Sequence, residues 1–111
     1  MPAASARDRK AALATLEKAE LVYALTRYPR SEVLDRARDV ETLREGLQAI
    51  RDAARELSAP RREELKIPWK QLEDPPEDDE ALWALAKKIA PVIIEELSPL
   101  VPKRSRTRRG R

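Results

Sequence analysis

The sequence contains no cysteine, no histidine and no phenylalanine among its 111 residues. Without cysteine there is no disulfide framework, no thiolate nucleophile and no thiolate zinc site, and without histidine the commonest metal ligand is missing. With only Gly46 and Gly110, the chain also lacks a glycine-rich phosphate loop and a dinucleotide fingerprint. We therefore predict no metal, no cofactor and no catalytic residues, because no pair of the remaining polar side chains stands at a spacing that indicates catalysis.

Aromatic residues are scarce, with two tryptophans and two tyrosines, whereas alanine and leucine are abundant. This composition favours helices that pack through small and branched side chains over a sheet. The length is near the commonest domain size and leaves no room for a second core. We predict an all-α fold, an up-and-down bundle of three to four helices over residues 1–101, followed by a disordered basic tail over residues 102–111.

Long apolar runs are missing as well. Residues 1–5 lack the apolar segment of a signal peptide, and nowhere do about 18 apolar residues follow one another as a membrane span requires. The sequence therefore predicts a cytoplasmic protein without a membrane partner.

The net charge of +3 hides an asymmetry between the tail and the rest of the chain. Without the tail, the chain carries 17 basic and 20 acidic residues. A basic tail can bind RNA phosphates electrostatically and without sequence preference, although it has no interleaved aromatic residues for base stacking. The alternative is a solvated tail with no dedicated ligand. The candidate nucleic-acid-binding residues are Lys103, Arg104, Arg106, Arg108, Arg109 and Arg111.

Apolar periodicity indicates a first helix that begins after a Ser5 cap and ends near Tyr28, before Pro29. Its expected buried stripe is Leu13, Leu16, Ala19 and Tyr23, with Leu21 and Leu25 beside it.

A second helix is expected from a Ser31 cap to about Ser58. It carries a heptad seam of Val33, Val40, Leu43, Leu47, Ile50, Ala54 and Leu57. We interpret this seam as one buried face of an antiparallel bundle rather than as a free-standing coiled coil, because other apolar helices can cover it. Gly46 inside this helix indicates a close approach of a neighbouring helix.

The segment after Pro60 predicts one or two helical turns and then a corner at Ile67-Pro68-Trp69, where Trp69 caps the core. Asp74, followed by Pro75 and Glu77, predicts the N-cap of a last long helix that reaches about Leu100. The carboxylates of residues 73–80 fit a helix N-terminus stabilised by the helix dipole better than a metal site. They are also compatible with an acidic patch for a basic partner.

The last helix is apolar on two sides. One stripe contains Leu82, Leu85, Ile89, Ile93 and Leu97, and the other contains Trp83, Ala86, Ala90 and Ile94. A second apolar stripe implies a second buried contact, which is either another subunit or the other helices of the same chain. We predict the second stripe as a dimer or partner interface. Pro91 is expected to kink the helix.

The order of residues 47–58, Ile67-Pro68-Trp69, Leu82-Trp83, Ile89 and Pro91 resembles the HepT-like branch of the HEPN superfamily. In that family, an Arg-Asn-x-x-x-His-x-Tyr segment lies between the Ile-Pro-Trp turn and the Trp of the last helix. Only thirteen residues separate Trp69 from Trp83 here, and the segment is missing. Neither the catalytic Arg and His nor the modified Tyr of the family has a counterpart in this sequence.

The resemblance implies a toxin–antitoxin ribonuclease family whose members form homodimers and pair with a small nucleotidyltransferase antitoxin. Because the catalytic segment is missing, we predict a degenerate subunit without ribonuclease activity, which binds a small nucleotidyltransferase or an active relative. The alternatives are an RNA-binding module that uses the arginine-rich tail and a residual ribonuclease that uses arginines and carboxylates in place of histidine.

Overall fold

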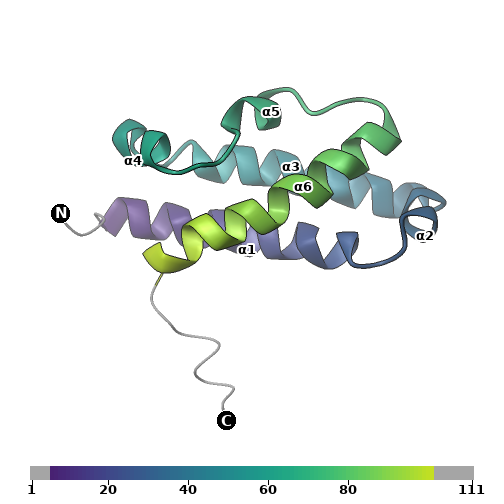
Figure 1. The fold of residues 1–111 in the computed structure, drawn as a ribbon, viewed down its shortest axis with the longest axis horizontal. Helices are drawn as coiled ribbons and strands as arrows, with labels where there is room; N and C mark the ends of the chain where they lie inside the picture. The colour runs from purple at the N-terminus through teal and green to yellow at the C-terminus, as the bar shows by residue number, and fades with distance from the viewer. Residues whose placement is uncertain (1–5, 102–111) are drawn as a thin grey trace, which may run out of the picture.

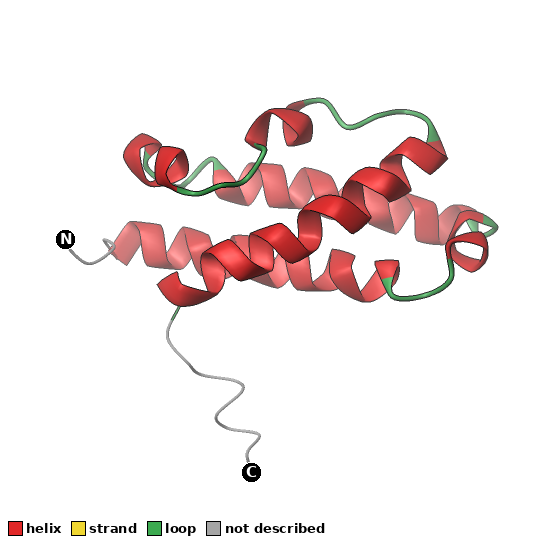
Figure 2. Ribbon diagram, in the orientation of Figure 1, coloured by secondary structure: helices red, strands yellow, loops and turns green. Residues whose placement is uncertain are grey.

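Three long helices form the framework of residues 6–101, the part of the chain that the computed structural model describes. They are α1 (Ala6–Thr26), α3 (Ala37–Ala54) and α6 (Asp79–Leu97). Figure 1 shows α1 and α3 antiparallel and side by side, with α6 crossing one face of this pair. All other elements of the described residues are short helices (Figure 2), namely α2 (Arg30–Leu34), α4 (Ala59–Glu64), α5 (Trp69–Glu73) and the 3₁₀ turn η1 (Ser98–Leu100). The all-α prediction is confirmed.

The buried face of α1 differs from the expected stripe. Thr15 and Thr26 are buried together with Ala12, Ala19 and Val22, whereas the predicted Tyr23 is 39 % exposed. The hydroxyl of Thr15 donates to the Ala11 carbonyl (2.7 Å) and that of Thr26 to the Tyr23 carbonyl (2.9 Å). Because these hydroxyls are satisfied within the helix, the two threonines can be buried at little cost.

The heptad seam is confirmed as a buried face, since all seven of its residues are at most 7 % exposed. The single helix predicted to carry it is wrong. The chain forms α2, turns at Asp35 and Arg36, and begins α3 at Ala37. Arg36 has an extended backbone (φ −113°, ψ 109°), which interrupts the helix. Ser31 lies inside α2 and is not its N-cap.

Gly46 marks a close approach of α1 and α3, as predicted. A Cβ atom at this position would lie 2.6 Å from Cγ2 of Val22 on α1. This separation is shorter than van der Waals contact between carbon atoms, so only glycine fits here without a shift of α1.

The segment between α3 and α6 lies over one side of the bundle. Its helical turn after Pro60 is confirmed as α4, and the Trp69 indole N–H donates to the Arg62 carbonyl (3.0 Å), which closes the Ile67-Pro68-Trp69 corner. The predicted helix start at Asp74 is wrong. Asp78 is the N-cap of α6, because its carboxylate accepts from the Ala81 N–H (2.8 Å).

Both apolar stripes of α6 are largely covered within the chain. The helix packs against α1, α2 and α3, and it contains Pro91 as predicted. Among residues 6–101, no helix combines the length and the apolar character that crossing a membrane requires.

Candidate functional site

The exposed large apolar side chains of the described residues belong to α1 and the turn that follows it. Leu21 is 64 % exposed, Tyr28 60 % and Tyr23 39 %. Leu21 and Tyr28 point to the side of α1 that adjoins α3, where three surface cavities follow one another along the helix pair. We call this surface the α1/α3 trough.

The three cavities of the trough lie at the two ends and the middle of α1. The first, of about 520 Å³, is lined by Arg7, Lys10, Ala11, Ala14, Ala53 and Glu56. The second, of about 210 Å³, is lined by Lys18, Leu21, Val22, Leu25, Thr42, Glu45, Gly46 and Ala49. The third, of about 360 Å³, is lined by Leu25, Tyr28, Glu32, Val33, Arg36 and Asp39.

Small residues form the floor of the trough. Ala14 faces Ala53 in the first cavity, and Gly46 and Ala49 line the second. Because these side chains are short, the surface between the two helices is hollow rather than ridged. The lining of the three cavities comes from α1, α2, α3 and the adjoining turns, so α4, α5 and α6 leave this side of the helix pair uncovered.

The two edges of the trough carry opposite charges. Lys10 and Lys18 lie on the α1 edge, and Glu45 lies on the α3 edge. None of these three side chains forms an ion pair within residues 6–101. Lys18 and Glu45 line the same cavity from opposite helices without meeting. Only at the end of the trough do the edges join, where Arg7 and Glu56 lie 3.8 Å apart.

Apart from the trough, a polar cluster joins the start of α1 to the residue that precedes α4. The carboxylate of Asp8 accepts from the Ser58 N–H (2.9 Å) and from the Ser58 hydroxyl (2.9 Å), and Arg61 Nε lies 3.8 Å away. The Ser58 N–H is the main cause that lowers the pKa of the Asp8 carboxyl, and the Ser58 hydroxyl and Arg61 lower it further. A carboxylate with a lowered pKa is a weak base, so this Ser–Asp pair holds the helices together rather than activating a nucleophile.

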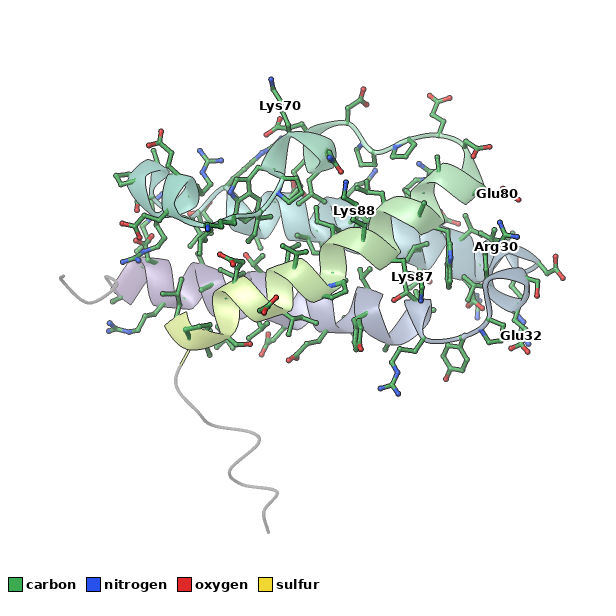
Figure 3. All side chains as sticks on the ribbon, viewed as in Figure 1. Arg30, Glu32, Lys70, Glu80, Lys87 and Lys88 are labelled. Carbon is green, nitrogen blue, oxygen red and sulfur yellow. The ribbon has the colours of Figure 1, made fainter. Side chains whose placement is uncertain are left out.

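A fourth surface cavity, of about 410 Å³, lies between α5 and α6 and is lined by Gln71, Asp74, Pro76, Ala84, Leu85 and Lys88. Arg44 of α3 fixes the loop beside it. Its guanidinium donates to the carbonyls of Pro76 (2.8 Å) and Glu77 (3.0 Å) and lies 3.8 Å from Asp79. Figure 3 shows Lys70 and Lys88 near this region, on α5 and α6. Lys88 shares the cavity with Gln71 and Asp74, whereas Lys70 is not among its lining residues.

The predicted interface stripe on α6 is mostly inaccessible. Trp83 is 6 % exposed, and Ala86 and Ala90 are fully buried, because other helices of the same chain cover them. Only Ile94 is partly exposed. The burial agrees with the alternative in which both stripes are covered within one chain, so periodicity no longer argues for a second subunit. The homodimer itself stays a prediction.

The acidic residues before and at the start of α6 have separate roles. Asp78 caps the helix, Asp79 lies near Arg44, and Glu80 lies 3.4 Å from Arg30 of α2 (Figure 3). Residues 6–101 bring no three potential metal ligands together. The candidate nucleic-acid-binding residues of the tail, 103–111, lie outside the described residues.

Sequence reasoning missed the trough and the Asp8–Ser58 tether. Leu21 was placed beside the buried stripe, although Ala14, Lys18, Leu21 and Leu25 recur at helical spacing on one side of α1. The matching small residues of α3, Ala49 and Ala53, recur at the same spacing outside the heptad seam. Two such stripes on neighbouring antiparallel helices are the signal that would have indicated this surface.

Comparison with protein-family models, with curated proteins and with solved structures finds no match to this chain. The resemblance to the HepT-like branch therefore stays a prediction.

Proposed function

We propose that this protein is a HepT-like interaction subunit of a toxin–antitoxin type module, which binds a small nucleotidyltransferase or an active relative and does not cleave RNA. The observation that carries the proposal is the α1/α3 trough. Its exposed Leu21 shares a cavity with the small residues Gly46 and Ala49 and with the unpaired charges of Lys18 and Glu45, and the exposed Tyr28 lines the next cavity. Exposed apolar surface with polar edges is typical of protein interaction sites.

The sequence supports the proposed absence of ribonuclease chemistry. The family's catalytic pair needs a histidine, and none occurs in the 111 residues. In the described residues, the one Ser–carboxylate pair is the Asp8–Ser58 tether, whose carboxylate is a poor base. These observations favour a binding role over a residual ribonuclease.

The basic tail supports the second candidate function, an RNA-binding module. Its six basic residues have no acidic neighbour between residues 102 and 111. Such a segment provides affinity for phosphates without base readout. We rank it second because sequence-independent affinity alone specifies no partner.

Affinity purification of the tagged full chain from its own cells tests the proposed function, with bound proteins identified by mass spectrometry and bound RNA quantified in the same eluate. We expect a small nucleotidyltransferase, or an active relative, in stoichiometric amount. RNA without a protein partner would overturn the proposal and favour the tail. Cleavage of RNA that persists through rigorous purification would also contradict it.

A further inference from the structure

We propose that the α1/α3 trough binds one amphipathic helix of the partner protein, with acidic side chains on its edge towards α1 and basic side chains on its edge towards α3. This inference rests on the proposed function and adds to it the kind of segment that docks and the surface that receives it.

The shape of the trough fits a helix. Two antiparallel helices form a groove into which the side-chain ridge of a third helix packs. Room for large side chains of the docked helix is left by the small side chains of Ala14, Ala49 and Ala53. Leu21 is exposed where it would contact that helix. The cavities accompany α1 from Arg7 to its C-terminal end, which is about 30 Å for its 21 residues. A docked helix of about 20 residues would span this length.

The charges specify the edges of the docked helix. Lys10 and Lys18 have no acidic partner within residues 6–101, and Glu45 across the trough has no basic one. Lys18 and Glu45 line the same cavity from opposite helices but do not form an ion pair. A helix lying between them would place one charged edge beside each, so that both are paired. A helix with two acidic or two basic edges would leave one repulsive contact.

The surfaces of α6 and α5 are weaker candidates for this partner. Trp83, Ala86 and Ala90 are buried within the chain. The cavity beside Lys88 is smaller than the first cavity of the trough, and no exposed large apolar residue lines it. Among the described residues, the exposed large apolar side chains belong to α1 and the turn after it, where unpaired charges lie on both sides of the trough.

Three synthetic helical peptides of about 20 residues test the proposal against the full-length protein by fluorescence anisotropy. All carry the same leucine stripe at i, i+3, i+4 and i+7. One has a glutamate edge and a lysine edge, the second has two glutamate edges, and the third has two lysine edges. We expect the mixed peptide to bind wild type about two- to fivefold more tightly than either of the others. Equal binding of all three peptides would overturn the assigned charges.

Charge variants of the protein are expected to change which of the three peptides binds most tightly. Lys18→Glu makes both edges acidic at the second cavity, which Lys18 and Glu45 line, and is expected to shift the preference towards the peptide with two lysine edges. Glu45→Lys makes both edges basic there and is expected to shift it towards the peptide with two glutamate edges. Lys70→Glu is the matched control, because Lys70 is exposed on α5, away from the trough (Figure 3). A shift in preference for Lys70→Glu as large as that for Lys18→Glu would mean that net charge, not the trough, selects the peptide.

A substitution of the apolar residue Leu21 tests where the peptide binds. Leu21→Glu places a charge under the docked helix and is expected to weaken binding of the mixed peptide by about tenfold or more. Since Leu21 is 64 % exposed, the substitution leaves the core unchanged. Tyr23→Glu is the control on the same helix, since Tyr23 is also exposed but lines none of the three cavities. Equal loss in both variants would overturn the assignment to the trough.

Capture of the partner separates this inference from the proposed function. If wild type and Leu21→Glu retain the same nucleotidyltransferase equally, the proposed function stands and the trough is not its site. If wild type retains none, the proposed function fails, and the peptide titrations still decide what the trough binds. A wild-type dimer that Leu21→Glu converts to monomer in light scattering would assign the trough to a second copy and overturn the inference.

Discussion

Gly46 of α3 packs directly against Val22 of α1, so closely that a Cβ atom on Gly46 would lie 2.6 Å from Cγ2 of Val22. Val22 is 1 % exposed and branched at Cβ, so it cannot rotate away from the contact freely. This contact sets the separation of the two helices that form the trough.

Gly46→Ala is therefore expected to destabilise the protein although alanine is the better helix former. Overpacking costs about 1–3 kcal/mol, and the gain in helix propensity offsets at most about 1 kcal/mol of it. Urea unfolding followed by circular dichroism measures the net loss, which we expect near 1 kcal/mol. In the double variant with Val22→Ala the added methyl group fits, so the two substitutions should be less harmful together than the sum of their separate effects. Additive losses would contradict the direct contact.

Asp78 and Asp74 provide a matched pair of substitutions at the start of α6. Asp78→Ala removes the hydrogen bond to the Ala81 N–H and should destabilise the protein by about 1 kcal/mol. Asp74→Ala is the control, because Asp74 is exposed, follows α5 as its C-cap residue and does not cap α6. We expect its free energy of unfolding to stay within about 0.5 kcal/mol of wild type. Similar losses in both variants would mean that the helix begins earlier than Asp79.

The start of α6 shows why the sequence predicted the wrong cap. Both Asp74 and Asp78 precede a helix-forming segment, and Asp74 is also followed by a proline and, three residues on, by a glutamate, the usual signs of a helix start. The choice depends on Arg44, which binds the carbonyls of Pro76 and Glu77 and holds these residues outside the helix. Arg44 lies more than thirty residues away in the sequence, and no local pattern reveals this tertiary contact.

The buried face of α3 was predictable in full and that of α1 only in part, since Leu16 and Ala19 are buried as predicted and Tyr23 is not. Residues Val40 to Leu57 repeat at heptad spacing with strongly apolar side chains, so periodicity identifies them. The buried face of α1 includes Thr15 and Thr26, whose hydroxyls are satisfied only by the helix backbone. Threonine is usually exposed, so the expected stripe included Leu13 and Tyr23 instead, of which Leu13 is half-buried and Tyr23 is 39 % exposed. Leu21 is apolar and was expected beside this stripe, so the candidate docking surface was missed.

Because of Asp8, we expect the stability of the protein to decrease as the pH falls into the acid range. The hydrogen bond from the Ser58 N–H, together with the hydrogen bond from the Ser58 hydroxyl and the nearby positive charge of Arg61, lowers the pKa of Asp8 in the folded state. A lowered folded-state pKa stabilises the fold above the ordinary carboxyl range near 4, and this contribution is lost as pH falls through the folded-state pKa.

Asp8→Asn should therefore destabilise the protein at pH 7 by about 1.5–3 kcal/mol, and by progressively less as pH falls below about 4. The melting temperatures of wild type and variant, measured from pH 7 to pH 2, should converge at the acid end. Asp52→Asn is the control, since Asp52 is exposed and its pairs with Arg51 and Arg55 lie at the surface, where such pairs contribute little. A constant difference between wild type and Asp8→Asn at every pH would mean that the charge of Asp8 is not what joins α1 to α4.

A prediction about RNA binding by the basic tail can be tested independently of the trough. If residues 102–111 bind RNA, deleting them removes six basic side chains and with them the salt dependence of binding. For single-stranded RNA, the logarithm of the binding constant falls by about 0.7 per phosphate contact for each tenfold rise in salt. A fully engaged tail therefore contributes a slope of about −4, which titrations of a labelled oligouridine at several salt concentrations measure. Replacing the six residues by glutamine should abolish the slope as completely as the deletion does. If the slope persists without the tail, the RNA contacts belong to residues 6–101, and the tail is a solvated segment with no dedicated ligand.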